Sequence, residues 1–402
     1  MDGNMRVLFV DDEPQVLRGI ERMLDAADVD WDVSFAESGQ EAIDLLEEET
    51  VETLVTDMRM PGMDGAELLK TVGERYPEVV RVVLSGQADK AAVFRAVQPM
   101  HQYLAKPCDA KTLTATISRA FALRNVLNSE SLHSLISGIS SLPSLPTVYQ
   151  KLMKELESES STLEKVGEII SQDPAMTAKI LQIVNSAMFG LRSPVRTPDR
   201  AASFLGIDTI KALALSIGVF REFDGMGMPG ISIDQLMAHS LKVAMFARII
   251  AAHEGQDSEF QNNAFTAGVL HDIGKLILIS SYKENFAEAM KRSRSSEIPL
   301  WQAEREVFGS DHSAVGAHLL NIWGLPQSII EVVALHHNPG EARENEFSIL
   351  TAVAAANFIH NNSVANNPLE SEWIEQYLSE VGAESKLETW ANACLQFEEL
   401  SE

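Results

Sequence analysis

The stretch Leu54-Val55-Thr56-Asp57-Met58-Arg59-Met60-Pro61-Gly62 places one carboxylate directly after an apolar run and just before a Pro-Gly turn. The run is typical of a buried strand, and the turn marks its end. A second apolar run, Val7-Leu8-Phe9-Val10, is followed by Asp11 and Asp12. Because open α/β sheets place their chemistry at the carboxyl ends of strands, we expect these carboxylates to lie close together. They would repel one another unless a hard divalent cation such as Mg²⁺ lies among them.

The first 125 residues alternate strand and helix signals, which predicts an α/β fold with a five-stranded, doubly wound parallel sheet. The expected strands are 6–10, 32–36, 53–56, 79–84 and 102–105. The expected helices are 14–27, 39–48, 65–75, 90–97 and 109–127. Ser85 would follow the fourth strand and Lys106 the fifth, so both would join the three carboxylates at one edge of the sheet.

This constellation resembles the flavodoxin-like receiver domain of bacterial response regulators. The resemblance implies that a sensor histidine kinase phosphorylates Asp57. It leaves open a homodimer through the receiver domain, and the oligomeric state does not follow from the sequence. It also implies a Mg²⁺ site and a set of switch or phosphate-contact residues. The Mg²⁺ ligands would be Asp11, Asp12, Asp57 and the backbone carbonyl of Arg59; the switch and phosphate contacts would be Ser85, Tyr103 and Lys106. The Lys106–Pro107 peptide bond is expected in the cis form.

The composition changes around residues 125–146. A serine-rich stretch over 128–141 leads into Leu142-Pro143-Ser144-Leu145-Pro146, whose two prolines cannot lie inside one helix. We therefore expect a receiver domain over 1–125, a linker helix or joint over 126–136, and an all-α output domain over 137–402 with its core at 137–345. Apolar residues at helical spacing predict short helices at 148–156, 163–172, 175–186, 197–205 and 209–220.

A second set of motifs follows the joint. It comprises Gln172-Asp173-Pro174-Ala175, Asn185-Ser186-Ala187-Met188-Phe189-Gly190, Ala201-Ala202-Ser203-Phe204-Leu205-Gly206, Gly268-Val269-Leu270-His271-Asp272-Ile273-Gly274-Lys275 and Trp323-Gly324-Leu325-Pro326. These motifs are similar to the HDOD domain, a helical relative of the HD phosphohydrolases. The resemblance covers most of residues 137–360.

Imidazole and carboxylate groups together suit a transition metal such as Mn²⁺ or Fe²⁺. The resemblance implies candidate ligands at His239, His271, Asp272, His312, His336 and His337, with Lys275 as a phosphate contact. Asn357 stands where a late aspartate ligand is expected, and residues 340–402 contain no Asp. A neutral amide is a weaker ligand, so metal affinity should fall. His133, His253, His318 and His360 are expected to be ordinary surface or core residues.

Composition limits the classes of partner. A formal net charge of −26 argues against binding to nucleic acid or to an anionic membrane surface. The two cysteines, Cys108 and Cys394, exclude a disulfide framework and favour a reducing compartment. Because no signal segment or apolar run near the roughly 20 residues of a membrane span is recognisable, we expect a cytoplasmic protein.

Two functions from different classes remain open. In the first, phosphorylation of Asp57 switches a helical domain that regulates other signalling proteins by binding them. In the second, phosphorylation gates a metal-dependent phosphohydrolase or phosphodiesterase built around His271 and Asp272. Asn357, set against an otherwise complete histidine set, is the sequence feature that divides the two, and it favours the non-enzymatic function.

Overall fold

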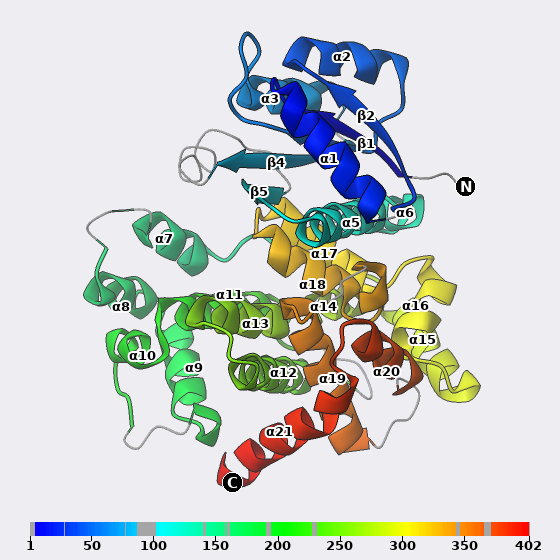
Figure 1. Cartoon of the computed structure of the whole chain (residues 1–402). Coiled ribbons are helices and arrows are strands. Elements are labelled where there is room, and N and C mark those ends of the chain that lie inside the picture. Colours follow the sequence, from blue (N-terminus) through cyan, green and yellow to red (C-terminus); the bar gives the residue numbers. More distant parts are fainter. Residues whose placement is uncertain are drawn as a thin grey trace. The chain divides into compact units, whose positions relative to one another are not determined.

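The computed structural model describes residues 5–27, 29–76, 78–86, 102–139, 142–156, 158, 161–189, 194–226, 231–342, 346–365 and 371–401. The chain divides into two compact units, the first over Met1–Asn128 with the short segment Glu341–Arg343, and the second over Ser129–Gly340 and Glu344–Glu402. Figure 1 shows the first unit as a sheet with flanking helices and the second as helices. The predicted succession of an α/β unit and an all-α unit is confirmed.

The first unit is an open parallel sheet. Its elements are β1 (Met5–Val10), α1 (Pro14–Ala26), β2 (Trp31–Ala36), α2 (Gly39–Glu48), β3 (Thr53–Thr56), α3 (Gly65–Arg75), β4 (Val80–Gly86), β5 (Gln102–Lys106) and α5 (Ala110–Leu127). Four parallel pairings join the strands in the order β2-β1-β3-β4-β5. The expected helix at 90–97 lies outside the described residues.

Alternating side chains of the strands build a core on each face of the sheet. Leu8 and Leu54 pack with apolar residues of α2 and α3, whereas Phe9 and Val55 pack with those of α1 and α5. The inner strands β1 and β3 are almost entirely buried, which explains their nearly continuous apolar sequences, whereas the edge strand β2 is mostly half-buried. The layer of helices on each face leaves the carboxyl edge of the sheet for polar groups.

The elements of the second unit are all helical. They are α6 (Glu130–Ser137), α7 (Thr147–Leu156), α8 (Leu163–Ser171), α9 (Pro174–Val184), η2 (Ala187–Phe189), α10 (Pro198–Leu205), α11 (Ile207–Glu222), α12 (Ile233–His253), α13 (Ser258–Leu270), α14 (Ile273–Ser281), α15 (Lys283–Ser296), α16 (Leu300–Phe308), α17 (His312–Ile322), α18 (Gln327–Leu335), η3 (Pro339–Ala342), α19 (Ile349–Ala365), α20 (Ser371–Glu380), η5 (Glu384–Lys386) and α21 (Leu387–Ser401). The serine-rich stretch after α5 therefore contains a helix, α6, which docks through Tyr282, whose hydroxyl donates to the Leu135 carbonyl at 2.7 Å.

The centre of the second unit is formed by α12 and α13, which pack against each other and against α19. Residues Ser258–Ser281, which span α13 and α14, are long and apolar enough to cross a membrane by length and composition alone, with a mean hydropathy of 1.2. This contradicts the expectation that no run approaches that length. Since 78% of the most apolar 18-residue window of this segment is buried inside the structure, its apolar composition is explained by its place in the core.

Candidate functional site

The first candidate site lies at the carboxyl edge of the sheet. Val10 and Thr56 are paired neighbours at the ends of β1 and β3, so the residues that follow them, Asp11 and Asp57, are also neighbours. The Asp57 backbone N–H donates to the Val10 carbonyl at 2.9 Å. Asp11 is 3% exposed, and the Asp57 side chain 12%. The strand register thus places two nearly buried carboxylates side by side.

Lys106, at the end of β5, joins these two carboxylates. Its ammonium group donates to Asp11 Oδ2 at 2.5 Å and to Asp57 Oδ1 at 2.6 Å. Burial opposes the lysine charge, but the hydrogen bonds and charges of the two aspartates outweigh burial and raise the pKa of Lys106. The following peptide bond, Lys106–Pro107, is cis, as expected. The lysine is therefore a fixed positive charge against Asp57.

The loop after β3 is held close to Asp57. The Arg59 backbone N–H donates to Asp57 Oδ2 at 2.7 Å. The start of α3 at Gly65 lies close to the Asp57 backbone. A side chain at Gly65 would place its Cβ 2.1 Å from the Asp57 carbonyl oxygen, so only glycine permits this close contact. The Lys106 ammonium and the Arg59 backbone N–H thus orient one carboxylate oxygen of Asp57 each.

The remaining residues predicted for this site fall into two groups. Asp12 follows Asp11 and is half-buried, so three carboxylates lie at or beside the strand ends. Such an oxygen-rich set suits Mg²⁺. Ser85 and Tyr103 lie in β4 and β5, opposite Ala105 and Val83 respectively. Their side chains lie outside the described part of the chain.

The second candidate site is a histidine cluster in the helical unit, and five helices supply it. His239 lies on α12, His271 and Asp272 connect α13 to α14, His312 opens α17, and His336 and His337 follow α18. The close packing of α14 on α17 depends on Gly274. A Cβ at this position would lie 1.9 Å from the His312 carbonyl oxygen.

Asp272 lies at the centre of the cluster, and each of its oxygens faces a different pair of imidazoles. Oδ2 lies 3.3 Å from His239 Nε2 and 3.4 Å from His271 Nε2. Oδ1 lies 3.2 Å from His312 Nε2 and 3.8 Å from His336 Nε2. The structure thus brings together all six predicted ligands in two groups that share Asp272; they are His239, His271 and Asp272 in one, and Asp272, His312, His336 and His337 in the other.

Hydrogen bonds on the far side of three rings determine which nitrogen faces Asp272. His271 Nδ1 lies 2.7 Å from the Gly268 carbonyl, and His336 Nδ1 lies 2.9 Å from the Val333 carbonyl. Because a carbonyl oxygen only accepts, both Nδ1 atoms must carry hydrogen. His312 Nδ1 is held by the Glu304 carboxylate at 2.5 Å. Such anchors are typical of metal-binding histidines, whose Nε2 lone pair faces the ion.

The donor set fits a transition-metal ion. The Nε2 atoms of His239 and His271 are 3.2 Å apart, and those of His312 and His337 are 3.0 Å apart. Two ligands at about 2.1 Å from one ion and at right angles to each other would be about 3 Å apart. Asp272 Oδ1 and His336 Nε2 are buried and have no hydrogen-bond partner among the residues that the structure describes. The cluster is therefore arranged as a chelating site.

Burial and neighbouring charges set the protonation of the cluster. Burial disfavours charge on His336 and His337 and lowers the pKa of both well below the usual value. Burial opposes ionisation of Asp272, but the charges of His271 and Lys275 outweigh it and hold its pKa well below the usual range. His312 differs, because the Glu304 carboxylate overcomes burial and raises its pKa to about 9.

Access to the cluster is restricted to one side. His271, His312 and His336 are fully buried, whereas 19% of the His239 side chain and 15% of the Lys275 side chain are exposed. The Lys275 ammonium donates to Asp272 Oδ2 at 2.7 Å. Any ligand that entered the cluster would therefore meet His239 and Lys275 first.

Three residues complete this picture. Glu304, which the sequence did not single out, is 0% exposed and also accepts the His312 backbone N–H at 2.9 Å. His360, expected to be an ordinary residue, has its ring centre 5.0 Å from that of His239, and burial lowers its pKa to about 4. Asn357 is buried one turn before His360 on α19, where its amide oxygen accepts from Asn361 at 3.3 Å.

Comparisons with known proteins identify both halves. The family described as the response regulator receiver domain matches residues 7–118, and the HDOD domain matches residues 142–339. The chain belongs to the receiver–HDOD response regulators. This confirms both resemblances seen in the sequence.

The curated relatives match this chain over only part of their own length. An uncharacterized protein of Treponema pallidum is 26% identical over 246 residues, which cover 60% of this response regulator and 47% of the relative. The hydrogenase transcriptional regulatory protein HoxA of Cupriavidus necator is 33% identical over 162 residues, which cover 40% of this chain and 32% of HoxA. The chain thus spans less than half the length of these relatives.

Solved structures support the helical fold. An HDOD domain protein of Geobacter sulfurreducens, 22% identical, aligns with a TM-score of 0.53 over 67% of this chain and 97% of its own. A protein of Shewanella amazonensis, 23% identical, aligns with a TM-score of 0.54 over 68% of this chain and 97% of its own. At these identities the similarity shows the fold alone.

Proposed function

We propose that this response regulator is the cytoplasmic effector of a two-component phosphorelay and that a sensor histidine kinase phosphorylates Asp57. The observation that carries the proposal is the contact of Asp57 with Lys106, beside the acid Asp11. An Asp57 oxygen attacks phosphorus while the bond to the kinase histidine breaks. Lys106 neutralises charge on the transferred group.

Mg²⁺ is the proposed cofactor of this step. Asp11, Asp12, Asp57 and the Arg59 carbonyl would hold it, and when bound it supplies positive charge to the phosphoryl oxygens. The resemblance to receiver domains assigns the switch to Ser85 and Tyr103. In this proposal they respond to the phosphoryl group and change the face formed by β5 and α5.

The proposed output is a change in protein binding by the HDOD domain. α5 ends at Leu127 and α6 begins at Glu130, so a short connection joins the receiver to the helical unit. In this proposal the helical unit has two conformational states, and a change in the packing of α5 would shift the equilibrium between them. The net charge of −26 favours protein partners over nucleic acid or an anionic membrane.

A pull-down tests this function. The full-length protein would be used as bait with Mg²⁺ and beryllofluoride, an analogue of the phosphoryl group, and compared with the same protein without beryllofluoride and with Asp57→Ala. We expect partners that depend on beryllofluoride in the wild type and are absent with Asp57→Ala. Identical partner lists in all three samples would refute the proposed switch.

A metal-dependent phosphohydrolase is the second candidate, and the convergence of imidazoles on Asp272 favours it. Mn²⁺ or Fe²⁺ would be held by the histidine cluster and would supply an activated water for attack on a phosphate ester. Lys275 would contact the phosphate. Two features weigh against catalysis: the ligands are almost fully buried, and the sequence has Asn357 where a carboxylate ligand is expected. We therefore favour a regulatory helical domain in which any bound metal is structural.

Metal analysis separates the two candidates. Purified protein would be assayed for Mn and Fe and for hydrolysis of bis(p-nitrophenyl) phosphate. The enzyme is supported if metal is stoichiometric and turnover is lost with Asp272→Ala but kept with His253→Ala, a histidine substitution outside the cluster. Stoichiometric metal without turnover supports the structural role.

A further inference from the structure

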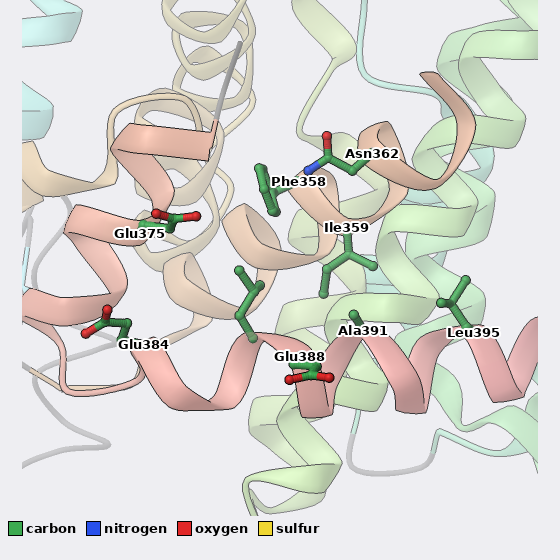
Figure 2. A pocket seen from close by; sticks show the side chains of 9 residues that line it. Phe358, Ile359, Asn362, Glu375, Glu384, Glu388, Ala391 and Leu395 are labelled. Carbon is green, nitrogen blue, oxygen red and sulfur yellow. The ribbon is translucent and has the colours of Figure 1, made fainter. Parts of the chain in front are cut away.

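Helices α19, α20 and α21 form a groove beyond the part of the chain that matches the HDOD family, which ends at residue 339. The groove has a volume of about 610 Å³. Figure 2 shows side chains from α19 above and from α21 below turned into the same space. We propose that this groove binds an amphipathic helix of a partner protein whose apolar face is bordered by Lys or Arg.

The floor of the groove is apolar. Phe358 and Ile359 of α19 are 9% and 5% exposed. They face Ala391 and Leu395 of α21 (Figure 2), and Leu387 of the same helix also lines the groove. Leu395 is 40% exposed, so its apolar side chain is accessible to a partner in the groove. A partner that covered it would remove apolar surface from water.

The spacing along α21 favours a helix as the occupant. Leu387, Ala391 and Leu395 recur every four residues, so they form a stripe on one face of the helix. The stripe is about 12 Å long at about 1.5 Å per residue. A helix laid along it would place apolar side chains from two successive turns against the floor.

The rim of the groove is acidic. Glu375, Glu384 and Glu388 line it and are exposed, and no described basic side chain forms an ion pair with any of them. Residues 346–402 contain ten Glu and no Asp or Arg, and their single Lys is Lys386. That lysine is bound to Glu254 at 2.5 Å.

This charge pattern selects the occupant. An acidic rim around an apolar floor repels nucleic acid, acidic peptides and anionic lipid, whereas Lys or Arg beside an apolar stripe is complementary to it. Trp390 and Lys386 both bind Glu254, at the end of α12, so the wall formed by α21 is fixed before a partner arrives. The partner's role in signalling rests on the proposed function, and the groove adds the place where that partner binds.

The test uses the full-length protein and a fluorescein-labelled 18-residue peptide with Leu at every third or fourth position and Lys at most others. Fluorescence anisotropy would measure its binding, with a peptide in which Glu replaces Lys as the control. We expect the Lys peptide to bind and the Glu peptide not to bind, and we expect the affinity for the Lys peptide to fall at higher salt. Glu388→Lys and Leu395→Asp should each weaken binding about tenfold or more, whereas Glu399→Lys, an exposed charge change outside the groove, should alter it less than twofold.

Equal effects of Glu388→Lys and Glu399→Lys, or no effect of Leu395→Asp, would overturn the proposal, because binding would then be general attraction to an acidic protein. Failure of the Lys peptide to bind would also overturn it. Repeating the titration with Mg²⁺ and beryllofluoride separates the two proposals. Groove binding that is unchanged by beryllofluoride leaves the docking site intact and contradicts only its control by Asp57.

Discussion

Replacing Glu304 by Gln tests whether the charge of this buried residue organises the histidine cluster. Glu304 is 0% exposed and holds His312 at both Nδ1 and the backbone N–H. The Glu304 carboxylate overcomes burial and raises the pKa of His312 from 6.5 to about 9. This difference corresponds to about 3 kcal/mol of stability. Gln keeps the shape of the side chain and removes its charge.

The sign of the pH dependence follows from the raised pKa. A histidine whose folded pKa is above its unfolded value stabilises the fold fully below about pH 6.5, and this stabilisation is lost as the pH rises through about 9. We therefore expect Glu304→Gln to lower the free energy of unfolding of the helical unit by about 3 kcal/mol at pH 6. At pH 10 the difference should shrink to about 1 kcal/mol, the contribution of a neutral hydrogen bond.

Urea unfolding of chelator-treated protein would measure both values. Trp301, whose ring stacks on His337 at 6.0 Å between centres, is a probe beside the cluster. A Trp31→Phe background limits the fluorescence to the helical unit. The matched control is Glu306→Gln, which removes a surface ion pair with Arg292 and should cost less than about 1 kcal/mol. A loss below about 1 kcal/mol at pH 6, or an equal loss at pH 6 and pH 10, would refute the reasoning.

Two further predictions concern single contacts. Lys106→Met should leave Asp11 and Asp57 without their shared cation, so the melting temperature should fall. Mg²⁺ should then raise the melting temperature of this variant more than that of the wild type. Differential scanning fluorimetry measures both values, and an equal response to Mg²⁺ would contradict this. Gly274→Ala should destabilise the helical unit by about 2–3 kcal/mol, because its Cβ would meet the His312 carbonyl oxygen. Urea unfolding measures the loss, and a change below about 0.5 kcal/mol would contradict this packing.

The acidic site was predictable because it depends on strand ends. An apolar run followed by a carboxylate fixes where a strand stops, and neighbouring parallel strands bring those ends together. The strands of the first unit begin and end within two residues of the expected positions, and Asp11, Asp57 and Lys106 meet as expected. The side chains of Ser85 and Tyr103 lie outside the described residues, so their switch role stays a prediction.

The histidine cluster was only partly predictable. The residues of the HD-type motifs come together around Asp272. Glu304 has no motif, and its role depends on the packing of α16 beside α17, a tertiary contact that helical spacing does not encode. A lone histidine on a helix is usually an ordinary surface or core residue, so the sequence does not predict a role for His360. The packing of α12 against α19 brings it to His239.

Hydrogen exchange of the full-length protein tests the central claim, that phosphorylation of Asp57 controls the helical domain. Exchange would be compared with and without beryllofluoride in the presence of Mg²⁺, for the wild type and for Asp57→Asn. The account predicts that beryllofluoride changes amide protection in the receiver and also within residues 129–401 of the wild type, and changes neither in Asp57→Asn. Changes confined to residues 5–128 would contradict it.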